Sequence, residues 1–237
     1  MVTEYLGDVY MLDDIKQEVL KYALEAEHMG LCRHRSGNFS VRDSETGLVC
    51  ITPNGLDRNE MTYHDIVVMN GQAQVVESEN HHRPTSEAIM HLKIYESRPD
   101  VNAVVHTHSK FAVTFAVLKK EIPAIVYELM NLGCKEGYIP VAPYGRPGTA
   151  ALAESVLKPL SISDVVLMES HGAVAVDKSI KEALLKAAYV EELAEIYYRT
   201  LTILGPGKEP PYIPNEELQK WAYPKEISCN LNTCISL

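Results

Sequence analysis

The stretch Val101–His108 limits the possible folds more than any other segment, because it is β-branched and mostly apolar, as strands buried on both faces are. Asp164–Glu169 has the same character. Apolar residues recur at helical spacing over Asp13–Leu31 and over Ser179–Leu204, and the second pattern ends at Gly205-Pro206-Gly207. Strands and helices therefore intermix along the chain, which predicts an α/β protein.

Two segments between these elements have the composition of turns. Ser36–Ser40 is rich in small polar residues and glycine. Asn70-Gly71 lies between two strand-like runs, His64–Met69 and Gln72–Val76. This dipeptide favours the positive φ angles of a two-residue turn, so we predict a tight β-hairpin there.

Composition excludes several classes of function. The net charge of −10 argues against a nucleic-acid-binding surface, which depends on Lys and Arg. No apolar run approaches the roughly 20 residues that span a bilayer, and Met1–Asp14 is acidic where a secretory signal would be basic. The five cysteines include no CxxC pair, so they indicate neither a disulfide framework nor a cysteine zinc site. We predict a cytoplasmic protein that binds a small ligand and neither nucleic acid nor membrane.

The motif His106-Thr107-His108 carries the clearest chemical signal. Residues two apart in a strand project to the same side, so both imidazoles face one way. His171 follows another apolar run and precedes Gly172, a residue that allows a sharp turn. If the three imidazoles meet, they leave one position open, as in catalytic zinc sites. The alternative is a solvated or pH-sensitive histidine pair, and spacing alone does not bring His171 to it.

Pro84-Thr85-Ser86-Glu87 precedes a helical pattern that runs through Ile94, and Thr85 or Ser86 is predicted to cap this helix. A glutamate at this place is usually a capping partner, although it could also transfer protons. The Thr and Ser hydroxyls and the unpaired amides at the helix start have two interpretations as well. They either cap the helix or bind a phosphate, which a helix N-terminus can hold even in an acidic protein.

Several motifs occur together in an order that resembles the class II aldolase/adducin family. They are Gly37-Asn38-Phe39-Ser40, Thr52-Pro53-Asn54-Gly55, Pro84-Thr85-Ser86-Glu87, Val105-His106-Thr107-His108 and Ser170-His171-Gly172. The likeness extends from about the first helix to Leu204. It implies one class II aldolase domain over residues 1–237, with a linker at 205–214 and a helix and tail at 215–237. It also implies a three-layer α/β/α fold with a mixed, largely antiparallel central sheet, and a homotetramer with active sites near subunit interfaces.

The resemblance also implies roles for individual residues. His106, His108 and His171 would bind Zn²⁺, and Glu87 would be the catalytic acid/base that also touches the metal. Tyr127 matches a catalytic tyrosine of the family, although it could equally be a core residue, and Tyr223 is a weaker candidate in the tail. The residues expected to surround the substrate phosphate are Asn38, Asn54, Gly55, Thr85 and Ser86. Position 54 departs from the family's commoner hydroxyl residue, but Asn can still donate a hydrogen bond.

The implied reaction is the reversible retro-aldol cleavage of a ketose 1-phosphate to dihydroxyacetone phosphate and an aldehyde. The similarity is greatest to the family members that act on L-fuculose 1-phosphate in fucose degradation and release L-lactaldehyde. L-Rhamnulose 1-phosphate and 5-deoxyribulose 1-phosphate are the next candidates. Three other functions remain open at this point. An L-ribulose-5-phosphate 4-epimerase is disfavoured by Glu87, where such enzymes carry Asp. A methylthioribulose-1-phosphate dehydratase would share the histidines, and an adducin-like binding module would need none of them.

Overall fold

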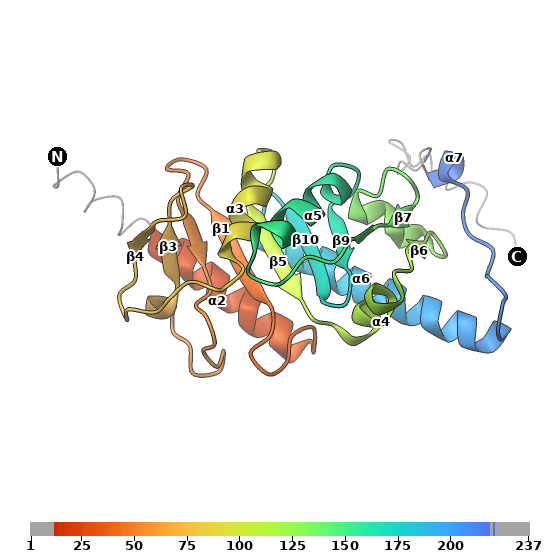
Figure 1. Cartoon of the computed structure of the whole chain (residues 1–237), viewed down its shortest axis with the longest axis horizontal. Coiled ribbons are helices and arrows are strands. Elements are labelled where there is room, and N and C mark those ends of the chain that lie inside the picture. The colour runs from red at the N-terminus through yellow and green to blue at the C-terminus, as the bar shows by residue number, and fades with distance from the viewer. Residues whose placement is uncertain (1–11, 219, 221–237) are drawn as a thin grey trace, which may run out of the picture.

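A computed structural model describes residues 12–218 and residue 220 (Figure 1). Its centre is an eight-stranded sheet with the order β4-β3-β2-β1-β5-β10-β9-β8. The strands are β1 (Asn38–Arg42), β2 (Val49–Ile51), β3 (Val67–Met69), β4 (Val75–Glu77), β5 (Ala103–Thr107), β8 (Val141–Ala142), β9 (Val165–Met168) and β10 (Gly172–Asp177). Every neighbouring pair is antiparallel except β8 and β9. The predicted mixed, largely antiparallel sheet is confirmed.

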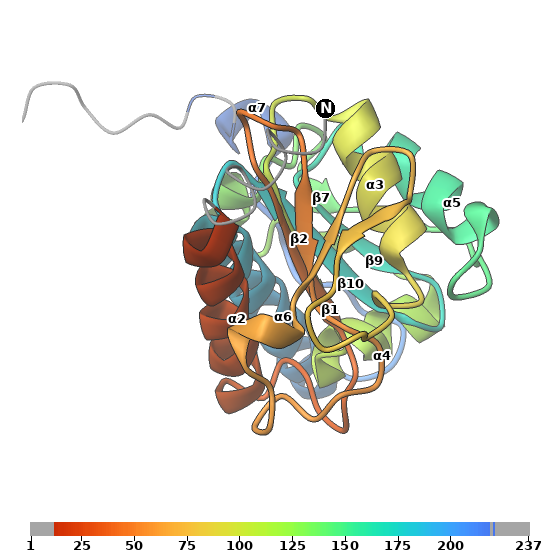
Figure 2. The ribbon, with the colours of Figure 1, turned by 90° about the vertical axis from the view of Figure 1, so that its left-hand side faces the viewer.

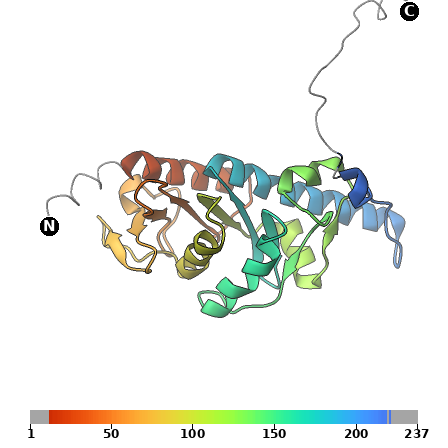
Figure 3. The ribbon, with the colours of Figure 1, turned by 90° about the horizontal axis from the view of Figure 1, so that it is seen from above.

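Helices cover both faces of this sheet. They are α2 (Asp13–His28), α3 (Ala88–Ser97), α4 (Lys110–Leu118), α5 (Ala150–Leu160), α6 (Ile180–Leu204) and α7 (Asn215–Leu218), with short 3-10 segments at η2 (Tyr63–Asp65) and η3 (Tyr127–Leu132). Figure 2 and Figure 3 show α2 and α6 on one face and α3 and α5 on the other. A small sheet pairs β6 (Ile122–Pro123) with β7 (Tyr138–Ile139). The three-layer architecture is therefore as predicted.

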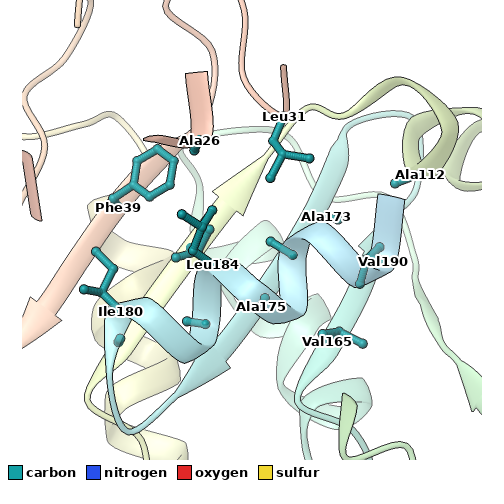
Figure 4. Packing of buried hydrophobic residues seen from close by; sticks show 14 of the residues in the cluster. Ala26, Leu31, Phe39, Ala112, Val165, Ala173, Ala175, Ile180, Leu184 and Val190 are labelled. Carbon is teal, nitrogen blue, oxygen red and sulfur yellow. The ribbon is translucent and has the colours of Figure 1, made fainter. Parts of the chain in front are cut away.

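The central strands are apolar on both sides because each side contacts a separate core. Ala103 and Val105 of β5 pack in the core that includes α2, α4 and α6, whereas Val104 packs in the core that includes α3 and α5. Figure 4 shows Ile180 and Leu184 of α6 in the first of these cores. Burial on both faces explains why the strand sequence is nearly continuous in apolar residues.

The same alternation directs polar side chains toward α3. In β1, Phe39 and Val41 belong to the α6 core, so Asn38 and Ser40 project to the opposite side. His106 lies two residues beyond Val104 and shares its side. The chemistry of the molecule is thus gathered between β1, β5 and the start of α3.

Two local predictions differ from the structure. Ser36–Ser40 was expected to be a turn, but Asn38 already begins the strand β1, which lies between β2 and β5. The β3–β4 hairpin is present, but its turn is longer than two residues and has Ala73, not Gly71, at positive φ (61°). The Asn70 side chain explains this, because its Oδ1 accepts the backbone N–H groups of Gln72 and Gln74 at 3.1 and 3.0 Å.

Other predicted boundaries agree with the structure. Ser179 caps α6 by accepting the backbone N–H of Glu182 at 3.3 Å, and the helix ends before Gly205. None of the helices within residues 12–218 combines the length and apolarity needed to cross a bilayer. Tyr223 lies outside the described residues, and the predicted extent of the domain over 1–237 stays a prediction.

Candidate active site

A cavity of about 320 Å³ opens where three loops meet the ends of β1 and β5. Its lining residues are Arg35, Ser36, Gly37, Asn38, Pro53, Asn54, Gly55, Thr85, Ser86, Glu87, His108, Pro147 and His171. The cavity therefore brings together all the residues predicted to bind phosphate, along with Glu87 and two of the predicted metal ligands. His106 does not line it because its side chain is fully buried.

Backbone pairing holds two of these loops side by side. Pro53 and Pro84 form an antiparallel bridge. The amide of Asn54 donates to the carbonyl of Arg83 at 2.9 Å, and the amide of Thr85 donates to the carbonyl of Thr52 at 3.0 Å. The turn that carries Asn54 thus lies directly against the segment that leads into α3.

The entry to α3 differs from the predicted cap. The N-cap residue is Glu87, and its side chain makes no capping hydrogen bond. Thr85 accepts the backbone N–H of Glu87 through Oγ1 at 3.3 Å, which forms a turn before the helix begins at Ala88. The prediction that Thr85 or Ser86 caps the helix was wrong by one or two positions. The Glu87 carboxylate is consequently available to the cavity.

Three imidazoles meet beside this carboxylate. One ring nitrogen from each of His106, His108 and His171 lies within 4.8 Å of the others, a spacing that could hold a metal ion. His106 Nδ1 is 2.9 Å from the carbonyl oxygen of Ala173, so it carries the proton and leaves Nε2 as a ligand atom. His106 Nε2 is 2.9 Å from His108 Nε2. The predicted convergence of His171 with the HxH pair is present.

The protonation of these rings suits a metal. Burial, with a further contribution from neighbouring His106, lowers the pKa of His108 to about 3 and that of His171 to about 4. Both imidazoles are therefore neutral near pH 7, which is the form that coordinates metals. Three imidazole nitrogens beside a carboxylate are a donor set that catalytic zinc sites use.

Glu87 is an ionised carboxylate in a buried position. Its side chain is 6% exposed, and Oε2 accepts from Asn38 Nδ2 at 2.8 Å. Oε2 lies 3.2 Å from His106 Nε2, and Oε1 lies 3.3 Å from His171 Nε2. Burial raises the pKa of Glu87, but the contacts with His106 and Asn38 outweigh it and keep the pKa well below its usual range.

Gly172 is required for close packing at this site. A Cβ there would lie 2.3 Å from the carbonyl oxygen of Thr107 and 2.9 Å from Cε1 of His106. The sharp turn that we assigned to Gly172 is made instead by Ser170, whose φ is 55°. Gly172 allows β10 to approach the two histidines, and Ser170 changes the chain direction ahead of His171.

Sequence reasoning missed one cation and did not place one tyrosine. Arg35 lines the cavity and donates from Nη1 to the carbonyl of Gly55 at 3.2 Å. The sequence signal for Arg35 was its position three residues before Asn38, which was already predicted to bind the phosphate. Tyr127 begins η3, is 46% exposed and does not line the cavity of its own chain. Its catalytic role therefore stays a prediction.

Three imidazoles and a carboxylate beside the cavity form a group that could hold one metal ion. The model of the class II aldolase and adducin N-terminal domain matches residues 17–198, and the chain belongs to this family of metal-dependent aldolases, which are lyases. It is similar to the 5-deoxy-D-ribulose 1-phosphate aldolase of Bacillus thuringiensis serovar kurstaki, at 36% identity over 90% of this chain and 95% of that one.

The chain is also similar to the L-fuculose phosphate aldolase of Escherichia coli K12, with 35% identity over 86% of this chain and 90% of that one. A solved structure of an L-fuculose 1-phosphate aldolase aligns with a TM-score of 0.81 at 35% identity and covers 87% of this chain and 93% of its own. These likenesses confirm the family that the motifs predicted, and they include more than one ketose phosphate.

We expect Gly172→Ala to lower metal content, because the added Cβ must displace the Thr107 backbone or the His106 ring. Overpacking of this kind costs about 1–3 kcal/mol in the free energy of unfolding. Gly71→Ala is the matched control, since a Cβ there meets nothing within 4 Å. Metal analysis and denaturant unfolding of both variants test this. Wild-type metal content in Gly172→Ala would contradict it.

Proposed function

We propose that the chain cleaves a ketose 1-phosphate reversibly by a retro-aldol reaction with Zn²⁺ held by His106, His108 and His171. The preferred substrate is L-fuculose 1-phosphate, and the products are dihydroxyacetone phosphate and L-lactaldehyde. The observation that carries the proposal is the buried carboxylate of Glu87, which lies 3.2–3.3 Å from two of the three imidazoles at the cavity. This arrangement places a proton-transfer group beside a metal ligand set.

The residues present fit a zinc ion. The donor atoms are imidazole nitrogens, which suit zinc better than magnesium or calcium, both of which prefer oxygen. When bound, the ion supplies Lewis-acid polarisation of the ketose carbonyl. No lysine Schiff base is then needed, and in agreement no lysine lines the cavity within the described part of the chain.

The protein itself has two proton transfers to perform. Glu87 protonates the carbon that is left after the carbon–carbon bond breaks, and it removes that proton in the reverse direction. The hydroxyl on the aldehyde side loses its proton to a second group, for which Tyr127 is our candidate. Because Tyr127 does not line its own cavity, this role requires the cavity of a neighbouring copy, in line with a homotetramer whose active sites lie near subunit interfaces.

Phosphate binding rests on three loops and one cation. Asn38, Thr85 and Ser86 offer polar side chains and amides, and the Asn54-Gly55 turn lies opposite them. Arg35 is the one permanently charged cation among the lining residues. Its guanidinium, held on the Gly55 carbonyl, can pair with a phosphate dianion at the cavity mouth.

5-Deoxyribulose 1-phosphate is the second candidate substrate, because the Bacillus relative named for it is as similar as the L-fuculose phosphate aldolase of E. coli. Cleavage of that ketose would release acetaldehyde with the same dihydroxyacetone phosphate. For location we propose the cytoplasm. Free, buried thiols at Cys32, Cys50 and Cys134 support a reducing compartment.

Purified protein should release dihydroxyacetone phosphate from L-fuculose 1-phosphate faster than from L-rhamnulose 1-phosphate or 5-deoxyribulose 1-phosphate. The release is measured by coupling it to reduction of the product, with zinc analysis on the same sample. Unphosphorylated L-fuculose is the control and should be a poor substrate. Equal catalytic efficiency with L-fuculose, or no cleavage of any ketose 1-phosphate, would refute the proposal.

Glu87→Gln should retain zinc and fold but lose proton transfer, because Gln has the shape of Glu and cannot shuttle a proton. The assay is exchange of the dihydroxyacetone phosphate proton with deuterated water, which isolates this step from bond cleavage. We expect the exchange rate to fall by about 10²–10⁴-fold. A wild-type exchange rate with bound substrate would show that Glu87 is not the base.

Arg35→Gln should raise KM for the ketose 1-phosphate by about 10–100-fold, the value of one charge-assisted hydrogen bond, with little change in kcat. Arg33→Gln is the matched control, since Arg33 is exposed in the same loop but does not line the cavity. Initial rates over a range of substrate concentrations separate the two constants. An unchanged KM in Arg35→Gln would exclude Arg35 from phosphate binding.

A further inference from the structure

A row of buried polar side chains lies behind the cavity and does not line it. Ser40 and His91 are fully buried, and Tyr95 is 4% exposed. They connect to Glu87 through Asn38, which does line the cavity. Buried polar groups reduce the stability of the fold unless each of them makes hydrogen bonds, so the partners of each side chain matter here.

The spacing of these residues on β1 matches their spacing on α3. Asn38 and Ser40 are two apart on β1 and face α3, while Glu87, His91 and Tyr95 recur every fourth residue at the start and along one side of α3. Two strand residues advance about 6.6 Å and four helix residues about 6 Å. The two rows therefore stay in register, and each strand residue meets two residues of the helix.

The direction of the hydrogen bonds follows from Glu87. An ionised carboxylate only accepts, so Asn38 must donate from Nδ2 to Oε2 at 2.8 Å, which turns its Oδ1 toward His91 Nε2 at 2.6 Å. His91 Nε2 therefore carries the proton. Burial lowers the pKa of His91 to about 3, so the ring is neutral and Nδ1 is an acceptor.

The next hydrogen bonds in the row, from His91 to Ser40 and Tyr95, continue this pattern. His91 Nδ1 accepts from Ser40 Oγ at 2.7 Å, and Ser40 Oγ lies 2.7 Å from the hydroxyl of Tyr95. The Tyr95 hydroxyl also lies 3.0 Å from the Ser40 carbonyl oxygen. Burial raises the pKa of Tyr95, so it keeps its proton and acts as the donor. From Ser40 Oγ through His91 and Asn38, each bond thus points toward Glu87.

The reverse arrangement is unfavourable. It needs the other tautomer of His91 and a flipped amide at Asn38. The amide oxygen of Asn38 would then face Oε2 of Glu87 at 2.8 Å, with an acceptor against a negatively charged acceptor. The buried row of hydrogen bonds therefore fixes the Asn38 amide in one orientation.

We propose that His91 is a positioning residue: it locks the Asn38 amide so that Oε2 of Glu87 is held and Oε1 is the atom that transfers the proton. In the structure Oε2 is engaged by Asn38 and lies beside His106. Oε1 accepts no hydrogen bond from the residues that the structure describes, although it lies 3.3 Å from His171 Nε2. This inference rests on the proposed role of Glu87 as the acid/base.

The test compares two substitutions of His91 in the full chain. His91→Leu removes the donor to Asn38, whereas His91→Gln places an amide N–H near the former Nε2 and restores it. We expect His91→Leu to exchange the dihydroxyacetone phosphate proton with deuterated water about 10–100-fold more slowly at saturating ligand, since loss of orientation at this scale has that effect. Its zinc content should stay near wild type, and His91→Gln should recover most of the rate.

Val156→Ala is the control for lost stability, because Val156 is an apolar, fully buried residue of the core between α3 and α5 and belongs to none of the hydrogen bonds of the polar row. Its exchange rate should equal that of wild type. If His91→Leu exchanges at the wild-type rate, or if the Gln and Leu variants are equally slow, the positioning role is overturned. A wild-type protein without exchange would instead refute the proposed function.

Ser40→Ala provides a second variant should His91→Leu fail to fold. It removes only the hydroxyl that fixes the tautomer of His91. Exchange at saturating dihydroxyacetone phosphate should slow, with zinc content unchanged. An unaltered exchange rate in folded Ser40→Ala would overturn the inference.

Discussion

The carboxylate of Glu87, buried at the junction of β1, β5 and α3, is the interaction on which the rest of the site depends. A buried charge is strongly unfavourable unless it is hydrogen-bonded and paired. Asn38 of β1 donates a hydrogen bond to it and His106 of β5 lies 3.2 Å from it, although the three residues are far apart in sequence. Their contact fixes the start of α3 against the two central strands, so the same contact positions the carboxylate and joins these elements of the fold.

The sheet makes this arrangement possible because the two faces of each central strand lie in different surroundings. One side of β1 and β5 contributes Phe39 and Val105 to the α6 core, and the other side contributes Asn38 and His106 to the site. A substitution on the first side would change stability, whereas one on the second would change chemistry. The packing is tight at the boundary, as Gly172 shows, since no side chain fits between β10 and the histidines.

The residues of the candidate site could be predicted from the sequence more fully than the strands that position them. His106 and His108 follow from strand periodicity, but the arrival of His171 depends on tertiary pairing of β10 with β5, which no local pattern encodes. β1 was missed because the side facing α3 is polar, which makes a central strand look like a turn. Tyr127 does not line the cavity of its own chain, so the role that we propose for it requires a neighbouring copy.

The division between rigid and exposed parts explains why the reaction is easier to infer than the substrate. Glu87 and His106 are held on a helix start and a central strand, and both are buried. The cavity mouth is formed instead by exposed loop residues, among them Arg35 and Asn54. Two relatives named for different ketose phosphates are similar to the chain at 36% and 35% identity. Overall identity is dominated by the shared frame, so discrimination between aldehydes must depend on the few side chains at the mouth and on any neighbouring copy that covers it.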